Sequence, residues 1–168
     1  MGAADTPKRP QPRLRKAAVV DVPAIHKLIM HYANARQMLP CSLSRLYESL
    51  RDFFVYETAD GVQACAALHV VWEDLAELRS LAVRPELQGR GIGRMLVEAC
   101  KEEARKLRLA RVFCLTYVPG FFERLGFKEV DKASLPHKVW ADCINCPQFP
   151  DCGEVPLLCD LASAGSGS

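Results

Sequence analysis

Between Leu78 and Gly93 the sequence reads LRSLAVRPELQGRGIG, and this stretch has the residue types of a phosphate-binding turn. A strand of alternating polar and apolar residues ends at Val83, a turn with a proline follows, and Gln88 precedes glycines at positions 89, 91 and 93. Glycines allow successive backbone N–H groups to lie close together, and the helix expected behind them adds the positive end of its dipole. We therefore predict that this turn binds a phosphate or a pyrophosphate.

The spacing of the glycines separates several kinds of phosphate-binding turn. A P-loop continues with Gly-Lys-Ser/Thr, whereas Arg94 and Met95 follow here. A dinucleotide-binding fold uses G-x-G-x-x-G, whereas these glycines stand at every second position. Both readings are therefore disfavoured. An ordinary joint between a strand and a helix is the remaining alternative to a phosphate-binding turn.

Length and composition indicate one globular domain. The chain has 168 residues, of which 49% are apolar and 25% charged, and its net charge is +2. This charge gives no reason to expect nucleic acid or a membrane surface as a partner, and no apolar run is long enough to span a bilayer. The sequence has 8 cysteines and no apolar core of a signal peptide. We therefore expect a cytoplasmic protein whose cysteines are free thiols or metal ligands.

Strands and helices alternate along the chain, without an internal repeat. Residues 1–12 are expected to be a disordered tail, 13–161 a single domain with a Cys-rich segment at 137–152, and 162–168 a flexible Gly/Ser tail. The domain is predicted to contain strands at 14–20, 53–58, 63–72, 76–83, 112–116, 127–130 and 155–161, and helices at 21–36, from Ser42 or Ser44 onward, after the glycine turn, and at 119–125.

Apolar spacing predicts which face of each helix is buried. The first helix is expected to bury Ile25, Leu28, Ile29 and Tyr32; the second, Leu46, Tyr47 and Leu50; and the helix after the glycines, Ile92, Met95, Leu96, Ala99 and Leu107.

A second block, Tyr117 to Phe127, reads YVPGFFERLGF and carries an aromatic pair followed by Gly-Phe. Together with Gln-x-x-Gly-x-Gly after a Leu-Ala-Val strand, it resembles the signature of the GNAT acetyltransferases. Within that superfamily, residues 14–161 are most similar to short, stand-alone bacterial N-acetylglutamate synthases. The segments that carry this closer resemblance are Cys65–Leu68, Ala76–Leu78, Leu81–Val83, Val112–Thr116, Glu123–Phe127, Leu135–Pro136 and Asp160–Leu161.

The resemblance implies an α/β (α+β) GNAT fold. Such a fold has a mixed central sheet of about six to seven strands, flanked by helices and splayed between its fourth and fifth strands. It also implies acetyl-CoA as co-substrate. Pantetheine would pair with the backbone of Leu81, Ala82 and Val83, where an N–H would meet the developing oxyanion. The pyrophosphate would lie against Gln88, Gly89, Arg90, Gly91, Ile92, Gly93 and Arg94.

Acetyl transfer to an amine requires a base for the ammonium and an acid for the departing thiolate. The resemblance assigns the base to Glu77, which acts directly or through a water. The alternative is a structural pair with Arg79, on the same face of the strand. Many GNAT proteins use a tyrosine as the acid where this chain has Phe122. The acid is therefore predicted to be Thr116, with Tyr117 or water as alternatives.

Glutamate as acceptor requires cations for two carboxylates. Arg79, the region of Ser80, His69 and Arg45 are the candidate substrate-binding residues. The resembled synthases usually carry a basic residue at the position of Cys41. Arg45, about one helical turn further on, is therefore a candidate for the missing cation.

The Cys-rich segment has the spacing of a metal site at one end. Cys143-x2-Cys146-x5-Cys152, with Cys159 and His137 nearby, is a candidate zinc site. Pro147 and Pro150 stiffen the intervening loop, and reduced thiols that pack a loop are the alternative.

The resemblance to these synthases implies transfer of an acetyl group from acetyl-CoA to the α-amino group of an amino acid. Glutamate is the expected acceptor, giving N-acetylglutamate in the first step of arginine biosynthesis. Glutamine, another small amine or a peptide N-terminus is the alternative acceptor. A non-catalytic acyl-CoA sensor or a metal-binding interaction module is the alternative of a different class. Assembly as a homo-oligomer is left open.

Overall fold

The computed structural model describes residues 8–136 and 153–162, and it contains a mixed sheet of seven strands in the order β1-β2-β3-β4-β5-β7-β6. The strands are β1 (Arg13–Lys16), β2 (Phe53–Thr58), β3 (Gly61–Trp72), β4 (Leu75–Val83), β5 (Arg111–Thr116), β6 (Lys128–Glu129) and β7 (Val155–Asp160). The helices are α1 (Val22–Asn34), α2 (Leu43–Glu48), α3 (Ile92–Lys106) and α4 (Pro119–Glu123), with short 3₁₀ helices η1 (Val19–Asp21), η2 (Leu50–Asp52), η3 (Pro85–Leu87) and η4 (Lys132–Ser134).

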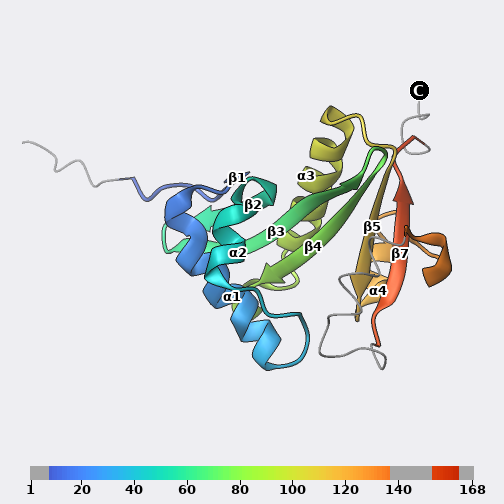
Figure 1. Cartoon of the computed structure of the whole chain (residues 1–168). Coiled ribbons are helices and arrows are strands. Elements are labelled where there is room, and N and C mark those ends of the chain that lie inside the picture. Colours follow the sequence, from blue (N-terminus) through green and yellow to red (C-terminus); the bar gives the residue numbers. More distant parts are fainter. Residues whose placement is uncertain (1–7, 137–152, 163–168) are drawn as a thin grey trace, which may run out of the picture.

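The sheet divides between β4 and β5, its only parallel pair among the strands that the structure describes. Pairing covers just Leu75–Glu77 on β4 and 111–113 on β5. Beyond Glu77 the two strands diverge, and Figure 1 shows them meeting near one end and separating toward the other. This confirms the predicted α/β fold with a splayed sheet. The last strand of the chain, β7, lies between β5 and β6 and pairs with both.

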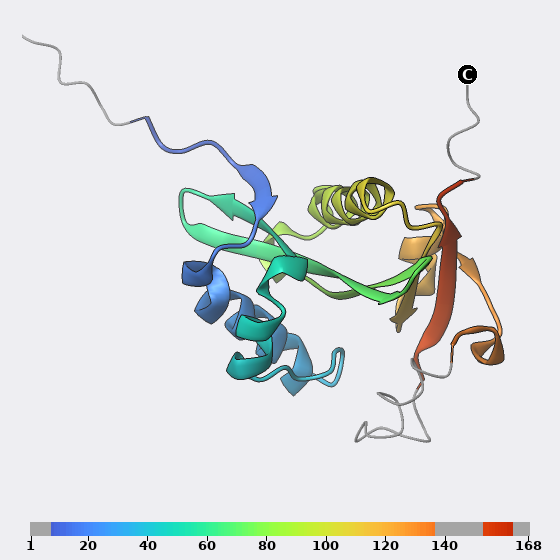
Figure 2. The same cartoon turned by 45° about the horizontal axis from the view of Figure 1, so that its top comes forward.

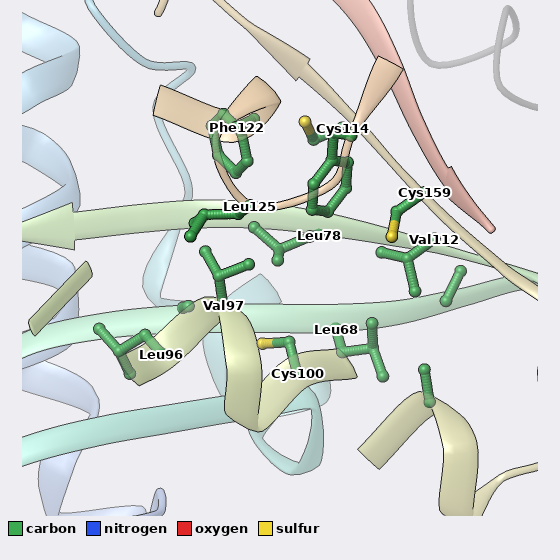
Figure 3. Packing of buried hydrophobic residues seen from close by; sticks show 14 of the residues in the cluster. Leu68, Leu78, Leu96, Val97, Cys100, Val112, Cys114, Phe122, Leu125 and Cys159 are labelled. Carbon is green, nitrogen blue, oxygen red and sulfur yellow. The ribbon is translucent and has the colours of Figure 1, made fainter. Parts of the chain in front are cut away.

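Helices cover the two faces of the sheet differently. α3 lies on one face of β2–β4, while α1 and α2 lie on the other (Figure 2). The larger core cluster joins α3, α4 and the sheet, and Figure 3 shows Leu96, Val97 and Cys100 of α3 facing Leu68 and Leu78. A second cluster packs α1 and α2 against β2, β3 and Ala82. The sheet is therefore buried on both sides at its centre, which fixes the strand ends that line the site.

Three predicted core positions are exposed. Met95 and Leu107 were placed on the buried stripe of α3, but the stripe follows four-residue steps through Ile92, Leu96, Cys100 and Ala104. Residues in such steps stay on one face of a helix, whereas Met95 lies off it and Leu107 follows the helix as its C-cap. Tyr47 is also exposed, because α2 has only six residues and buries Leu46 alone. Ser42, one of the two predicted starts, caps α2 by accepting a hydrogen bond from the Arg45 N–H.

The first strand is shorter than predicted, because Asp21 organises a turn before α1. β1 ends at Lys16, and the Asp21 carboxylate accepts hydrogen bonds from both terminal nitrogens of Arg15, at 2.7 and 3.0 Å, and from the Ala18 N–H at 2.7 Å. Asp21 therefore ties β1 to the start of α1, and as the N-cap residue it makes no side-chain capping hydrogen bond to the helix. The Arg15 guanidinium lowers the pKa of Asp21, partly offset by burial.

This network predicts a pH-dependent stability. Because the folded-state pKa of Asp21 is depressed, its contribution is present above the ordinary carboxyl pKa and is lost as pH falls through the folded value. Asp21→Asn should therefore lower the free energy of unfolding by about 1–3 kcal/mol at neutral pH, and the deficit should shrink in acid. Urea denaturation across pH measures this. The control Asp60→Asn, in the exposed β2–β3 turn, should show no such trend, and a deficit independent of pH would contradict the account.

Among the residues that the structure describes, no helix is long and apolar enough to cross a membrane.

Candidate active site

A cavity of about 1650 Å³ opens where β4 and β5 diverge. Its walls come from the α1–α2 connection, β3, β4, the glycine turn, β5 and α4. Of the predicted site residues, it brings together Arg45, His69, Glu77, Arg79, Ser80, Leu81, Val83, Gln88, Gly89, Gly91, Ile92, Gly93, Arg94 and Thr116. Ala82 and Arg90 do not line it. The Ala82 side chain is buried against α1, and Arg90 is exposed on the outer side of the turn.

A β-bulge in β4 explains the position of Ala82. Ala67 pairs with Arg79 and Cys65 with Ala82, so two residues of β4 oppose one of β3. Ser80 within this bulge has a left-handed backbone, with φ of 57°. A bulge reverses which face each later side chain takes, so Ala82 turns toward α1 while Leu81 and Val83 turn the other way. The bulge thereby interrupts regular pairing beside the cavity, where backbone groups are needed for a ligand.

The glycine turn has the geometry of an anion site. Gly89 and Gly91 have φ of 76° and 82°, in the left-handed region that other residues enter at a cost of about 1–2 kcal/mol. Gly91 is the N-cap of α3, and the first helical hydrogen bond runs from the Met95 N–H to its carbonyl. The N–H groups of the first turn consequently have no partner within the helix. They point to the same region as the positive, N-terminal end of the dipole of α3, a helix of 15 residues. The residues present therefore fit a pyrophosphate.

Two side chains fix this turn against neighbouring elements. The Tyr32 hydroxyl of α1 donates to the Val83 carbonyl, and Gln88 Nε2 donates to the Tyr32 oxygen at 2.7 Å. Burial raises the pKa of Tyr32, against the opposing effect of the bond from Gln88. On the other side, a Cβ at Gly93 would lie 3.2 Å from the Phe121 ring, so α4 packs tightly on the start of α3. The turn is held in place from α1 and from α4.

Glu77 lies where β4 and β5 separate. It is the last residue of β4 that pairs with β5, and its carboxylate lies 3.6 Å from an Arg79 terminal nitrogen. Its side chain is 18% exposed. The contact with Arg79 is the structural pairing that the sequence left as an alternative. At this distance the pair is loose, and Glu77 also lines the cavity, so both roles stay available to it.

Thr116 occupies the end of β5 on the opposite wall. It is buried, and its hydroxyl oxygen accepts a hydrogen bond from the Val118 N–H at 3.0 Å. The hydroxyl proton is thereby directed away from that contact. Tyr117 is more exposed and also lines the cavity. Phe122, at the position of the tyrosine used by many GNAT proteins, is buried and stacks edge to face with Phe121 and Phe127.

The charges of two arginines act on Cys41. Burial raises the pKa of the Cys41 thiol, while the positive charges of Arg45 and Arg79 act to lower it. Arg45 comes from α2 and Arg79 from β4, and all three residues line the cavity. The sequence anticipated both arginines, but not that their charges act on the same thiol from different elements.

No group of three or more His, Cys, Asp and Glu with the arrangement of a metal site occurs among residues 8–136 and 153–162. The zinc candidates Cys143, Cys146 and Cys152, with His137, lie outside the described residues. Cys159 is described, and it is a buried free thiol in β7. Free thiols are also found at Cys41, Cys65, Cys100 and Cys114.

Comparison with known proteins places this site in a family. Residues 49–129, which include the glycine turn and the aromatic block, match the model of the acetyltransferase (GNAT) domain. An uncharacterized N-acetyltransferase of Chlorobaculum tepidum is 39% identical over 94% of this chain and 98% of its own length. An amino-acid acetyltransferase of Mycobacterium tuberculosis is 40% identical over 81% of this chain and 79% of its own. The chain belongs to the GNAT acetyltransferase family.

Solved structures agree with this assignment. The structure of Rv2747 from M. tuberculosis, in complex with CoA and NLQ, has a TM-score of 0.76 at 35% identity and covers 88% of this chain and 98% of its own. N-acetylglutamate synthase from Neisseria gonorrhoeae, with coenzyme A and N-acetyl-glutamate, has a TM-score of 0.83 at 26% identity. This chain covers only 36% of that larger protein. The predicted enzyme class, an acetyl-CoA-dependent amino-acid acetyltransferase, is confirmed by these relatives.

Proposed function

We propose that this enzyme transfers the acetyl group of acetyl-CoA to the α-amino group of L-glutamate, giving N-acetylglutamate, the first intermediate of arginine biosynthesis. The observation that carries the choice of glutamate is the presence of two arginines, Arg45 and Arg79, in the same cavity as Cys41, the glycine turn and Glu77. A solved relative bound to N-acetyl-glutamate supports the same acceptor class.

The coenzyme would bind along the diverging strands. Its pyrophosphate would accept hydrogen bonds from the N–H groups of the turn at 89–94, with Arg94 adding charge from the cavity wall. Its pantetheine would pair with the backbone of Leu81 to Val83 beyond the bulge. The thioester carbonyl would then lie near Ser80 and Leu81, where an N–H can stabilise the oxyanion.

The reaction itself is a direct attack of the amine on the thioester carbon. Glu77 would take a proton from the ammonium, directly or through a water, because a free amino acid is mostly protonated at neutral pH. The nitrogen–carbon bond then forms and the carbon–sulfur bond breaks. Thr116, on the opposite wall, gives its proton to the thiolate and regains one from the nitrogen, whose second proton is thereby passed to the sulfur. Thr116 is rigidly held by its bond from Val118, which favours delivery in one direction.

The two carboxylates of glutamate give the arginines their role. Arg79 is partly buried on β4, close to Glu77, and would hold the α-carboxylate near the reacting amine. Arg45 is exposed on α2 and lines the cavity, and it would hold the side-chain carboxylate. It thereby replaces the basic residue expected at Cys41.

Arg45→Ala should raise KM for glutamate by about 10- to 100-fold, which corresponds to the ~1.5–3 kcal/mol of a charge-assisted hydrogen bond. Cys41→Arg should lower KM for glutamate, because it adds a cation at the position the synthases use. Steady-state kinetics with saturating acetyl-CoA measures both. Arg105→Ala, on the far end of α3, serves as the control and should leave KM unchanged. Unaltered glutamate kinetics in both variants, with faster acetylation of another amine, would contradict glutamate as the acceptor.

A further inference from the structure

His69 and Asp52 form a pair on the cavity wall. The His69 Nδ1 atom of β3 lies 2.7 Å from an Asp52 carboxylate oxygen, at the end of η2. The His69 side chain is 42% exposed and lines the cavity, whereas Asp52 lies behind it with 27% exposed.

Asp52 fixes the tautomer of the imidazole. An ionised carboxylate only accepts hydrogen bonds, so the neutral ring must carry its proton on Nδ1. Its lone pair then lies on Nε2. Among the contacts of the described residues, Nε2 has no hydrogen-bond partner, and the ring is partly exposed in the cavity. Neutral imidazole with a fixed Nδ1–H is the form that accepts protons at near-neutral pH.

The ring lies beside Glu77. His69 and Glu77 are directly opposite each other in the antiparallel pair of β3 and β4. Side chains at such positions lie on the same face, with Cβ atoms about 4.5–5.5 Å apart. The charged groups near His69 are Asp52 from η2 and, from β4, Glu77 with its partner Arg79, while Arg45 of α2 lines the same cavity. Glu77 is less exposed than His69, at 18% against 42%.

Acetyl transfer releases one proton to solvent. The ammonium nitrogen loses two protons as it becomes an amide, the leaving sulfur takes one, and the other must leave the cavity. A carboxylate, with its ordinary pKa near 4.3, holds a proton from an amine poorly, whereas an imidazole, with its ordinary pKa near 6.5, holds it better. The proton that must leave the cavity is therefore better received by a histidine that reaches water.

We propose that His69, held in its Nδ1–H tautomer by Asp52, accepts the ammonium proton from Glu77 on Nε2 and releases it to solvent. In this step an O–H bond on Glu77 breaks and an N–H bond on His69 forms. The imidazolium then returns to the neutral ring by losing that proton to water. Asp52 is a positioning residue in this arrangement. The inference rests on the proposed amino-acid acetylation and adds the route by which its proton departs.

Variants of both residues test this route. His69→Gln should lower kcat by about 10²-fold while KM for acetyl-CoA and for the acceptor amino acid stays within about twofold. In the wild-type enzyme kcat/KM should fall as pH falls, because the ring must be neutral. Asp52→Asn should also lower kcat, because an amide in place of the carboxylate no longer restricts the ring proton to Nδ1. His26→Gln on α1 and Asp60→Asn in the β2–β3 turn are the matched controls, and neither should change the profile.

Two further readouts separate a proton route from a structural pair. Added imidazole should restore part of the rate of His69→Ala, and ¹⁵N spectra of histidine-labelled wild-type enzyme should show the His69 ring protonated on Nδ1 and bare on Nε2. A rise in acceptor KM with kcat retained would make His69 a carboxylate ligand and overturn the proposal. So would unchanged kcat, or a ring protonated on Nε2, whichever amino acid is acetylated. A wild-type enzyme that acetylates no amino acid would instead refute the proposed function, and this route with it.

Discussion

Glu77→Gln should lower kcat by about 10²–10⁴-fold near neutral pH, because glutamine keeps the size of the side chain and cannot accept the ammonium proton. The deficit should narrow as pH rises, since the amine then loses its proton without help. A profile of kcat from about pH 6 to about pH 10, with saturating acetyl-CoA, measures this deficit and its change with pH. Glu77 lies at the point where β4 and β5 separate, so a change there acts on the cavity rather than on the paired part of the sheet.

The competing role for Glu77 is its ion pair with Arg79, at 3.6 Å. A purely structural pair predicts a loss of thermal stability with kcat largely retained. Coenzyme affinity by calorimetry and the melting temperature are therefore measured alongside the rate. Glu73→Gln, in the exposed turn between β3 and β4, is the control and should behave as wild type. Full activity of Glu77→Gln at neutral pH would assign the carboxylate to structure and the base to another group.

Gly91→Val should raise the apparent KM for acetyl-CoA about tenfold or more, while the fold survives. Gly91 has φ of 82° and is the N-cap of α3, so a branched side chain would displace the N–H groups that the pyrophosphate needs. Loss of one charge-assisted hydrogen bond, at ~1.5–3 kcal/mol, accounts for at least that factor. Titration calorimetry with coenzyme A measures the affinity directly.

Gly61→Val separates lost binding from backbone strain. Gly61 also has a left-handed backbone, with φ of 96°, and a Cβ at either glycine would meet no atom within 4 Å. It lies in the β2–β3 turn, outside the cavity. Both substitutions should lower stability to a similar extent, but only Gly91→Val should weaken coenzyme binding. Equal coenzyme affinity in the two variants would contradict the assignment of the turn.

The sequence predicted the order of the elements and the glycine turn because both depend on local signals. Strand alternation, the spacing of glycines 89, 91 and 93 and the Asp60–Gly61 turn are all readable within a few residues. The position of β7 between β5 and β6 could not be predicted from local signals, because strand order depends on pairing between segments far apart in the chain. The exposure of Met95 and Leu107 has a local cause. The buried stripe follows four-residue steps from Ile92, and positions reached by three-residue steps move away from that stripe within a few turns.

Parts of the site without a sequence signal were missed. The bulge at Ser80 carries no glycine, so nothing marked the place where the side chains of β4 change faces and turn Ala82 away from the cavity. Asp52 was missed because its partner His69 lies 17 positions along the chain. Tyr32 was read as a core residue from its place on the apolar face of α1. Its hydroxyl instead holds the Val83 carbonyl, a contact between elements far apart in sequence.

The most direct test of the central claim is a thiol-release assay with acetyl-CoA and each of the standard amino acids in turn. Release of coenzyme A should be fastest with L-glutamate, by kcat/KM, and the product should carry the acetyl group on the α-nitrogen. Glu77→Gln should abolish most of that signal. Absence of thiol release with every amino acid, or a higher kcat/KM for an amine without a second carboxylate, would contradict acetylation of glutamate by this enzyme.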